Sequence, residues 1–121
     1  MNQRKIVGNN GEKEACKYLI KNNYTIIEKN FRCRSGEIDI IANDDSTGEL
    51  VFIEVKTRTN YHYGKPAEAV TKLKQKHIVS ATRYYLYIHK ISKRFIRFDV
   101  IEILDSYKKY INHIKKVNIY I

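Results

Sequence analysis

Two strand-like segments joined by a short turn constrain the fold of this chain more than any other feature. The segments are Glu37–Ala42 and Leu50–Thr57, and Asp44–Gly48 between them has the composition of a tight turn. Because side chains alternate between the two faces of a strand, Glu54 and Lys56 share one face of the second segment. The rest of that segment is apolar, as in a strand whose two faces are both covered. We therefore expect these two charges to have a function.

The expected pairing of the two segments sets their acidic residues against each other. A hairpin that closes symmetrically about its central turn places Asp39 opposite Glu54. The same register places Glu37 opposite Lys56, and neighbouring registers keep these side chains on diagonals. Glu37, Asp39 and Ile41 then share one face of the first segment, and its other face carries Ile38, Ile40 and Ala42.

Two carboxylates that face each other across a strand pair repel unless a cation lies between them. Asp39 and Glu54 supply the hard oxygen ligands that Mg²⁺ and Mn²⁺ prefer, and the two segments contain no histidine or cysteine that would favour zinc. For any one of these residues taken alone, a solvated strand face is the alternative. Their combination in a central strand favours a metal site, with Mg²⁺ (or Mn²⁺) as the cofactor.

Hydrophobic periodicity predicts two helices. The first begins with Asn9 as its N-cap, and Glu12 follows three residues later as in a capping box. It ends at Asn22 and Asn23. The second covers Ala67–Lys90. The apolar arc of this second helix comprises Val70, Leu73, His77, Ala81, Tyr84, Tyr85 and Ile88.

Three further segments have the composition of strands: Tyr24–Arg34, Phe95–Leu104 and Ile114–Ile121. The element order is therefore α, β, β, β, α, β, β. A chain of 121 residues has room for one compact domain, and no repeat or linker divides it. We predict a single α/β domain over residues 1–121, in which a central mixed β-sheet contains an antiparallel meander and is flanked by helices.

The charge of the chain predicts a polyanionic partner. Lysine and arginine number 23 against 13 aspartate and glutamate, so the formal net charge is +10. Such a surface attracts phosphate backbones or anionic lipid. Cys16 and Cys33 lack metal-ligand spacing and suit reduced thiols. Because we find no signal peptide and no apolar run of membrane-spanning length, we expect a cytoplasmic protein with no membrane partner.

Two motifs resemble those of a known family. Gly36–Ile41 has the sequence GEIDII and Phe52–Arg58 has the sequence FIEVKTR. They resemble the GEIDLI and FVEVKTR motifs of the YraN family of small bacterial proteins. Shorter matches follow in the same order along nearly the whole chain, at Gly11-Glu12, Asn30–Arg34, Lys74-Gln75 and Arg97–Val100. That family is similar to the PD-(D/E)xK nuclease superfamily, which includes archaeal Holliday-junction resolvases.

The resemblance implies a restriction-endonuclease-like core with the order α-β-β-β-α-β. It also implies that Asp39 and Glu54 bind the metal ion and that Lys56 is the catalytic lysine. Glu12, on the first helix, would be a further carboxylate near the site.

Three of the candidate residues have a structural alternative. Glu12 is also the expected capping-box partner of Asn9, and Glu37 is also a strand-edge acid that Lys56 would neutralise. Lys74 lies inside the apolar arc of the second helix, where it either extends toward solvent or points its ammonium at the site. We keep Glu12 and Glu37 beside Lys56 as candidate catalytic residues, and the family match favours a function for Lys74.

Basic residues that border the expected metal site are candidates for nucleic-acid binding. They are Arg32, Arg34, Arg58 and Lys65, joined by Lys74 from the second helix. A separate basic stripe on the outer face of that helix is typical of a solvated surface, and it comprises Lys72, Lys76, Arg83 and Lys90.

The expected function is a Mg²⁺-dependent endonuclease that hydrolyses phosphodiester bonds of DNA, with branched DNA as one form of substrate. RNA is the second expected partner, and a homodimer is expected only by analogy with junction-cleaving enzymes. The alternative is a non-catalytic nucleic-acid-binding module that retains the nuclease fold. A membrane- or protein-docking domain is a third interpretation, which the charge allows but the carboxylate pair does not explain.

Overall fold

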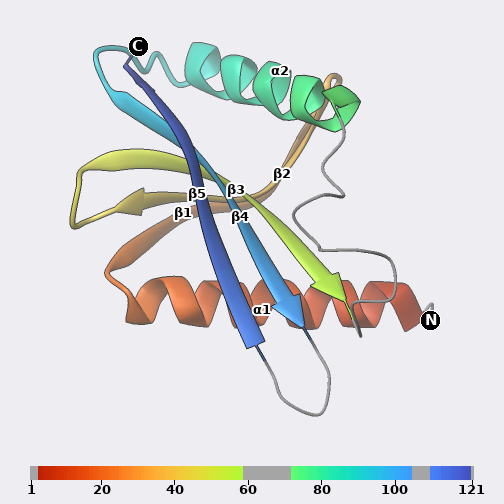
Figure 1. The fold of residues 1–121 in the computed structure, drawn as a ribbon. Helices are drawn as coiled ribbons and strands as arrows, with labels where there is room; N and C mark the ends of the chain where they lie inside the picture. The colour runs from red at the N-terminus through yellow and green to blue at the C-terminus, as the bar shows by residue number, and fades with distance from the viewer. Residues whose placement is uncertain (1–2, 59–71, 105–109, 121) are drawn as a thin grey trace.

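The computed structural model describes residues 3–58, 72–104 and 110–120, and it describes the side chains of residues 11–57, 75–104 and 110–116. Within these residues, two helices cover opposite faces of one sheet (Figure 1). Neither of these helices is long and apolar enough to cross a membrane. In chain order the elements are α1 (Gln3–Lys21), β1 (Tyr24–Cys33), β2 (Gly36–Asp44), β3 (Glu49–Arg58), α2 (Lys72–Ile88), β4 (Phe95–Leu104) and β5 (Tyr110–Tyr120).

The strands of the described residues form one mixed sheet in the order β1-β2-β3-β4-β5. β1, β2 and β3 make an antiparallel meander, β4 lies parallel to β3, and β5 returns antiparallel to β4. The parallel step needs a crossover connection, and α2 lies in that connection. The predicted α/β domain with a central mixed sheet and flanking helices is confirmed. This layout is consistent with a restriction-endonuclease-like core.

The β2–β3 hairpin has the register expected from the sequence. Ile40 pairs with Ile53, and Asp44 pairs with Glu49. In the turn, Gly48 has a φ of 80°, and its N–H donates a hydrogen bond of 2.7 Å to the carbonyl oxygen of Asp44. Glycine suits this position because it adopts the left-handed conformation at little cost.

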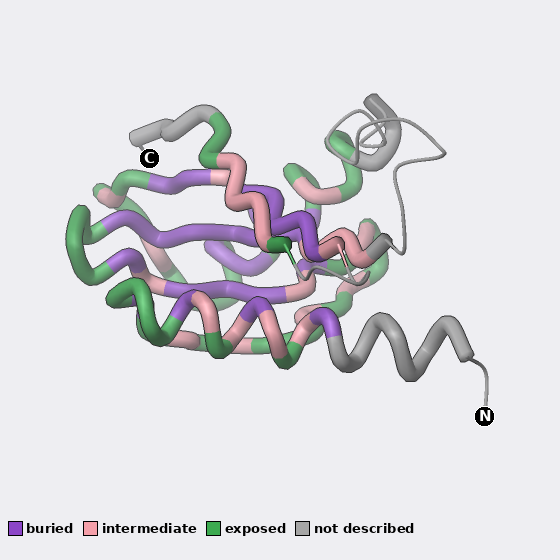
Figure 2. The backbone as a smooth tube through the Cα atoms, turned by 60° about the horizontal axis from the view of Figure 1, so that its bottom comes forward, coloured by how far each residue is buried: buried purple, intermediate pink, exposed green. Residues whose placement is uncertain are grey.

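One hydrophobic cluster lies between α1 and the sheet. Ala15 and Leu19 on α1 are fully buried, and they pack on the apolar side chains that alternate along the central strands. Buried positions recur along α1 and along the central strands of the sheet (Figure 2). The spacing of four residues places both on one face of the helix. Their partners in the sheet are Ile40, Ala42, Val51, Ile53, Ile101 and Ile103.

A second hydrophobic cluster lies between α2 and the opposite face. It includes Phe52, Ile96 and Tyr85, together with Ile38 from β2. Strict alternation from Ile40 predicts the α1 face for Ile38, so this part of the prediction is wrong. The irregularity coincides with the end of the ladder between β2 and β3, beyond which β2 is paired only with β1.

The buried side of α2 differs from the expected arc. Ala81 and Tyr85 are buried as predicted, but Tyr84 and Ile88 are 48% and 42% exposed, and Leu86 is buried instead. Tyrosine is amphipathic, so a periodicity count that treats it as apolar misplaces the buried face. His77 is also exposed, and the side chains of Val70 and Leu73 lie outside the described residues.

The start of α1 was predicted incorrectly. The helix begins at Gln3, so Asn9 lies inside it and is not the N-cap. Glu12 is therefore not a capping-box partner. The other end agrees with the prediction, because Asn23 has a φ of 67°, the left-handed conformation that commonly ends a helix.

Two later boundaries also differ from the prediction. α2 ends at Ile88 rather than at Lys90. Lys90 has a φ of 52°, a left-handed conformation that is incompatible with a continuing right-handed helix. β5 begins at Tyr110 rather than at Ile114. The expected start of the second helix at residue 67 lies outside the described residues.

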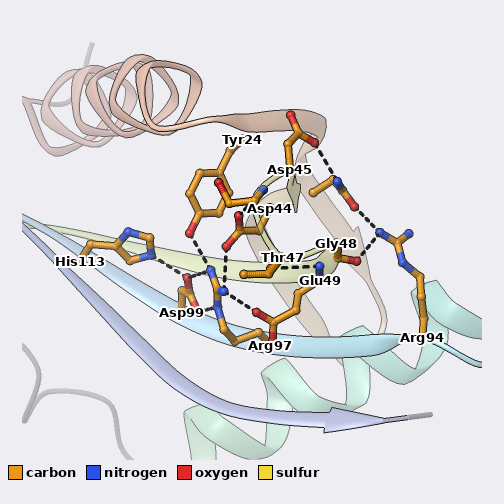
Figure 3. Close-up of polar contacts among 12 residues, drawn as sticks. Tyr24, Asp44, Asp45, Thr47, Gly48, Glu49, Arg94, Arg97, Asp99 and His113 are labelled. Atoms are coloured by element: carbon orange, nitrogen blue, oxygen red, sulfur yellow. Dashed lines mark hydrogen bonds and ion pairs between the residues drawn. The ribbon is translucent and has the colours of Figure 1, made fainter.

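A buried charged network joins the strands at the hairpin end of the sheet (Figure 3). Arg97 on β4 is 5% exposed, and one of its terminal nitrogens donates hydrogen bonds to Asp44 at 2.9 Å and to Glu49 at 2.7 Å. The guanidinium also donates to the Tyr24 hydroxyl at 2.6 Å and to both oxygens of Asp99 at 2.8 and 2.9 Å. One cation thus contacts three buried carboxylates, although Oε2 of Glu49 has no hydrogen-bond partner among the described residues.

The network continues to β5 and to α1. Nε2 of His113 lies 2.6 Å from Asp99, and Nδ1 of the same ring lies 3.0 Å from the hydroxyl of Tyr18. Burial alone would raise the pKa of Asp44, but hydrogen bonds from Arg97 and from the Ser46 N–H hold it below its ordinary value. The carboxylate therefore stays charged inside the protein.

Replacing Arg97 with leucine is expected to destabilise the fold strongly. The change leaves Asp44, Glu49 and Asp99 buried together without their cation, which typically costs about 3–5 kcal/mol. Because the pKa of Asp44 is lowered, its share of the stability is present above the ordinary aspartate pKa and is lost as the pH falls. Urea unfolding of Arg97→Leu at neutral pH measures the loss.

The matched control is Arg83→Leu, which removes an exposed arginine from α2 and is expected to be nearly neutral. If Arg97→Leu does not fold, Tyr24→Phe removes only the hydroxyl that accepts a hydrogen bond from Arg97 and donates one to Asp44, and it should cost about 1–3 kcal/mol. Equal stability of wild type, Tyr24→Phe and Arg97→Leu would contradict a stabilising role for the network.

Candidate functional site

Asp39 lies where β2 and β3 separate. Ile40 and Ile53 form the last backbone pair of the hairpin ladder toward this end. One residue further along, Oδ2 of Asp39 accepts a hydrogen bond of 2.8 Å from the backbone N–H of Val55. A side-chain carboxylate thus takes the place of a strand carbonyl as the acceptor. Continued by one step, the observed register sets Asp39 opposite Glu54, as expected.

Glu54 and Lys56 form a nearly buried ion pair on the α2 face of β3. Glu54 is 8% exposed, and the Lys56 side chain is 20% exposed. Nζ of Lys56 lies 3.0 Å from Oε1 of Glu54. Their common face and the apolar residues around them agree with the alternation seen in the sequence.

Glu37 pairs with Arg32 rather than with Lys56, which corrects the expected cross-strand pairing. Arg32 and Glu37 are opposite each other on β1 and β2, and their side chains approach to 3.4 Å. Because β2 has separated from β3 at this point, Lys56 meets a carboxylate of its own strand instead. The Arg32–Glu37 pair is 73% and 51% exposed, and such pairs add little stability. Both side chains therefore remain available to a ligand.

Glu12 reaches the site because α1 packs tightly on the end of β3. A Cβ atom on Gly11 would overlap the hydroxyl of Thr57 and lie 3.2 Å from the Cβ of Thr57. This contact requires the absence of a side chain at Gly11. The neighbouring Glu12 is half-buried and acts electrostatically on Asp39.

The acids around Asp39 change its ionisation. Burial raises the pKa of Asp39 from 3.8 to about 6, against the opposite effect of the Val55 N–H. The negative charges of Glu12, Glu54 and Glu37 add to the increase. Three other carboxylates are thus close enough to disfavour the charged form of this one. A cation at this position would relieve the repulsion.

A cavity of about 390 Å³ opens beside these groups, and its lining includes Glu37, Asp39, Glu54, Val55 and His77. The turn before β2 lies directly against α2 there, since a Cβ on Gly36 would lie 2.8 Å from the carbonyl oxygen of His77. The cavity is large enough for a hydrated ion or a phosphate group.

The donor set suits a hard divalent cation that keeps part of its water. Among the residues whose side chains are described, no three His, Cys, Asp or Glu residues form a ready-made metal cage. Mg²⁺ commonly takes only one or two protein carboxylates, and water and substrate phosphate complete its shell. Asp39 and Glu54 are sufficient for such a site, so the residues present fit the expected ion.

Two of the predicted basic residues border the site. Arg32 and Arg34 line a second cavity of about 550 Å³, which we call the basic cavity. It shares Gly36, Glu37 and His77 with the cavity beside Asp39, which we call the acidic cavity. A ligand that fills both cavities meets the acids and the arginines together. The side chains of Arg58, Lys65 and Lys74 lie outside the described residues.

His77 and Glu102 lie near the site, although the sequence analysis did not single them out as functional. Glu102 is 6% exposed and lies beside Lys56 in the parallel register of β3 and β4. One of its oxygens accepts a hydrogen bond of 3.3 Å from Asn112, and the other has no partner among the described residues. Alternation along β4 was the available signal, since it places Glu102 on the same face as Val100.

Asp39→Asn is expected to stabilise the metal-free protein above pH 6. The folded pKa of about 6 exceeds the ordinary value of 3.8, so protonation of Asp39 favours folding below pH 4, and this contribution is lost as the pH rises through 6. Asparagine does not ionise and can still accept the Val55 hydrogen bond. Urea unfolding in EDTA should show a gain of about 3 kcal/mol at pH 8, since each pKa unit corresponds to about 1.4 kcal/mol, and a much smaller gain at pH 4.

Asp45→Asn is the control, because hydrogen bonds from Thr25 and Asn43 lower the pKa of that exposed carboxyl. A lowered pKa stabilises the fold above the ordinary aspartate pKa, so this variant should be less stable than wild type at pH 8. A loss of stability in Asp39→Asn at pH 8 would show that Asp39 is not strained by its neighbours.

Comparison with known proteins identifies a family whose sequence model covers both motifs. The sequence model of the uncharacterised protein family UPF0102 matches residues 11–103, which include both the GEIDII and the FIEVKTR segments. A UPF0102 protein of Clostridium perfringens strain SM101 is 49% identical over 92% of each chain. A UPF0102 protein of Caldicellulosiruptor saccharolyticus is 40% identical over 98% of this chain and 96% of its own.

A further relative, a UPF0102 protein of Geobacter metallireducens, is 50% identical over 84% of this chain and 82% of its own. The names of these relatives state no activity, so the expected relationship to the PD-(D/E)xK nucleases stays a prediction. The extent and identity of the matches establish the family itself. The chain belongs to the uncharacterised protein family UPF0102.

Proposed function

We propose that this protein is a Mg²⁺-dependent endonuclease that binds DNA and hydrolyses its phosphodiester bonds. The observation that carries the proposal is that Asp39 and Glu54 line one acidic cavity, that Lys56 is ion-paired with Glu54, and that a basic cavity adjoins the acidic one. Carboxylates alone would repel a phosphate, and arginines alone would bind it without cleavage. The combination suits a phosphodiester that is held together with a divalent cation.

Each side chain of the site has a distinct role in this proposal. Asp39 and Glu54 would hold Mg²⁺, which when bound would polarise the scissile phosphate and lower the pKa of the attacking water. Lys56 would orient that water and offset the negative charge that develops in the transition state. Burial and the negative charges of Glu12, Glu54 and Glu37 raise the pKa of Asp39 to about 6, so cation binding should release a proton at pH values near and below 6.

The basic residues would position the nucleic acid. Arg32 and Arg34 border the acidic cavity and are well placed to bind the phosphate next to the cleaved one. The net charge of +10 would attract the substrate over a longer range. A cytoplasmic location is part of the proposal, and Cys16 and Cys33, both among the described side chains, are free thiols.

One observation favours a second function, a non-catalytic nucleic-acid-binding module. The ion pair of 3.0 Å between Lys56 and Glu54 already neutralises one carboxylate without a metal ion. A site that has given up catalysis could keep this pair for stability while the arginines still bind phosphate. The two functions differ in whether cleavage is observed and not in whether nucleic acid binds.

Nucleic-acid affinity is expected to fall steeply as salt rises, because each neutralised phosphate releases counterions. Arg32→Gln with Arg34→Gln should weaken binding and reduce the salt slope by about one for each phosphate that is no longer neutralised. Fluorescence anisotropy with labelled DNA and RNA in EDTA measures both quantities without cleavage.

A matched double variant, Lys76→Gln with Arg83→Gln, removes the same charge from the outer face of α2. It should change the affinity less than the pair at the site. If both double variants behave alike, only the overall charge matters and the arginines do not form a binding site. Affinity that is independent of salt would contradict the phosphate-binding proposal altogether.

Lys56→Ala is expected to abolish most cleavage while nucleic-acid affinity stays within a small factor of wild type. The loss of one preorganised charge typically costs about a hundredfold to a thousandfold in rate. Single-turnover assays with linear, branched and single-stranded DNA and with RNA, in Mg²⁺, Mn²⁺ or EDTA, measure the effect. Lys56→Arg keeps the charge but replaces a compact ammonium with a planar guanidinium, so it should also be impaired.

Lys76→Ala, which removes an exposed lysine from α2, is the control and should cleave like wild type. A thermal melt of each variant separates lost chemistry from lost folding. Equal losses of binding and cleavage in Lys56→Ala would make the lysine a phosphate-binding residue. If wild type cleaves none of these substrates with any of the ions, the protein is a binding module.

A further inference from the structure

An apolar cavity adjoins the acidic one. It has a volume of about 330 Å³ and lies between α2 and the α2-facing side of the sheet. We call it the apolar hollow; its walls include Ile38, Phe52, Ile78, Val79, Phe98 and Val100. Phe52 and Phe98 form an aromatic part of this wall, with ring centroids 6.1 Å apart.

The apolar hollow and the acidic cavity are neighbours that share part of their lining. Both are lined by Glu37, Glu54 and Ile78. The acidic cavity in turn shares Glu37 and His77 with the basic one. Three environments therefore lie next to one another beside residues 75–80 of α2: arginines, carboxylates, and an apolar chamber. A ligand that spans them needs an anionic part followed at once by a flat apolar part.

A nucleotide has this construction. Its phosphate suits the arginines and a cation at Asp39 and Glu54, whereas the largely apolar walls of the hollow offer few groups, chiefly Gln75 and Lys116, to replace the water around a phosphate. The two faces of a base are apolar and stack favourably on an aromatic ring such as that of the partly buried Phe98. Gln75 and Lys116 lie at the edge of the hollow, where an amide and an ammonium can hydrogen-bond to the polar rim of a base.

We propose that the apolar hollow receives the base next to the phosphate held at Asp39 and Glu54. A base inside an intact duplex is stacked and paired, so only an unpaired or flipped base can enter. The substrate class is therefore nucleic acid with unpaired nucleotides at the point of attack, such as single strands, bulges and junctions. This inference rests on the proposed function, because it uses the acidic site as the place of the phosphate.

The test uses short oligonucleotides that carry one 2-aminopurine, either in a single strand or in a bulge, with a blunt duplex for comparison. Binding is followed by anisotropy with Ca²⁺, a hard cation that suits carboxylate ligands, and a gel run on each sample verifies that the probe stays intact. Wild type should bind the bulged or single-stranded probe about tenfold more tightly than the duplex, the size expected for one base stacked on aromatic side chains. The 2-aminopurine fluorescence should change on binding.

Val79→Phe fills the apolar hollow from a residue that is 38% exposed and therefore tolerates the change. It should lose the tenfold preference and the fluorescence change while duplex affinity stays the same. Ile88→Phe makes the same kind of substitution on α2 away from the hollow and should behave like wild type. Gln75→Ala, at an exposed helix position, should weaken the preference without any effect on folding.

The outcomes separate this inference from the proposed function. If nucleic acid binds with the expected salt dependence but Val79→Phe and Ile88→Phe keep the same preference, only the base-binding role is wrong. An abasic probe bound as tightly as the 2-aminopurine probe would also overturn that role. If no nucleic acid binds at all, the proposed function fails and this inference fails with it.

Discussion

The buried guanidinium of Arg97 is the interaction on which the arrangement of the sheet depends. It binds side chains of β1, β2, β3 and its own strand, and Asp99 extends the network to β5. These partners meet only in one register, because a slip of one residue would move each of them to the opposite face. The hairpin of β2 and β3 is therefore fixed at its closed end, where Asp44 and Glu49 flank the turn. At the other end the same two strands separate, and Asp39 lies in the space between them.

The carboxylates at the two ends of the β2–β3 hairpin differ in how completely they are neutralised. At the closed end, three carboxylates share a cation that belongs to the chain and cannot leave. At the open end, Asp39 and Glu54 lie among further carboxylates, and the pKa of Asp39 is raised even though the ammonium of Lys56 lies beside Glu54. Carboxylates that are neutralised by a buried side-chain cation hold the structure rigid. Carboxylates that are only partly neutralised attract an ion that can exchange with the solvent. A cluster of carboxylates that is only partly neutralised, in a strongly basic chain, is consistent with the proposed site for a cation and a phosphate together.

Local geometry explains which features could be predicted from the sequence. The common face of Glu54 and Lys56 and the hairpin register follow from two consecutive strands and the turn between them, so alternation was sufficient. The partner of Lys56 was not predictable, because it depends on where the strands separate beyond Ile40. The hydrogen bonds of Arg97 come from strands far apart in the chain, and no short pattern encodes them. The arrangement of the cavities depends on which side of α2 faces the sheet. The hydrophobic pattern did not predict that side, because it counted exposed tyrosine and histidine residues as apolar.

The contact between Gly11 and Thr57 sets the distance between α1 and β3, and with it the distance between Glu12 and Asp39. At this point the backbone of Gly11 lies against the side chain of Thr57, and a Cβ atom on Gly11 would overlap that side chain. Glu12, the next residue, is carried to the site by that closeness and raises the pKa of Asp39 from outside the sheet. A chain with a larger residue at position 11 would hold its helix further out and leave Asp39 more acidic, with every residue of the sheet unchanged. The proton affinity of the site is thus set in part by a residue that has no side chain and touches no ligand.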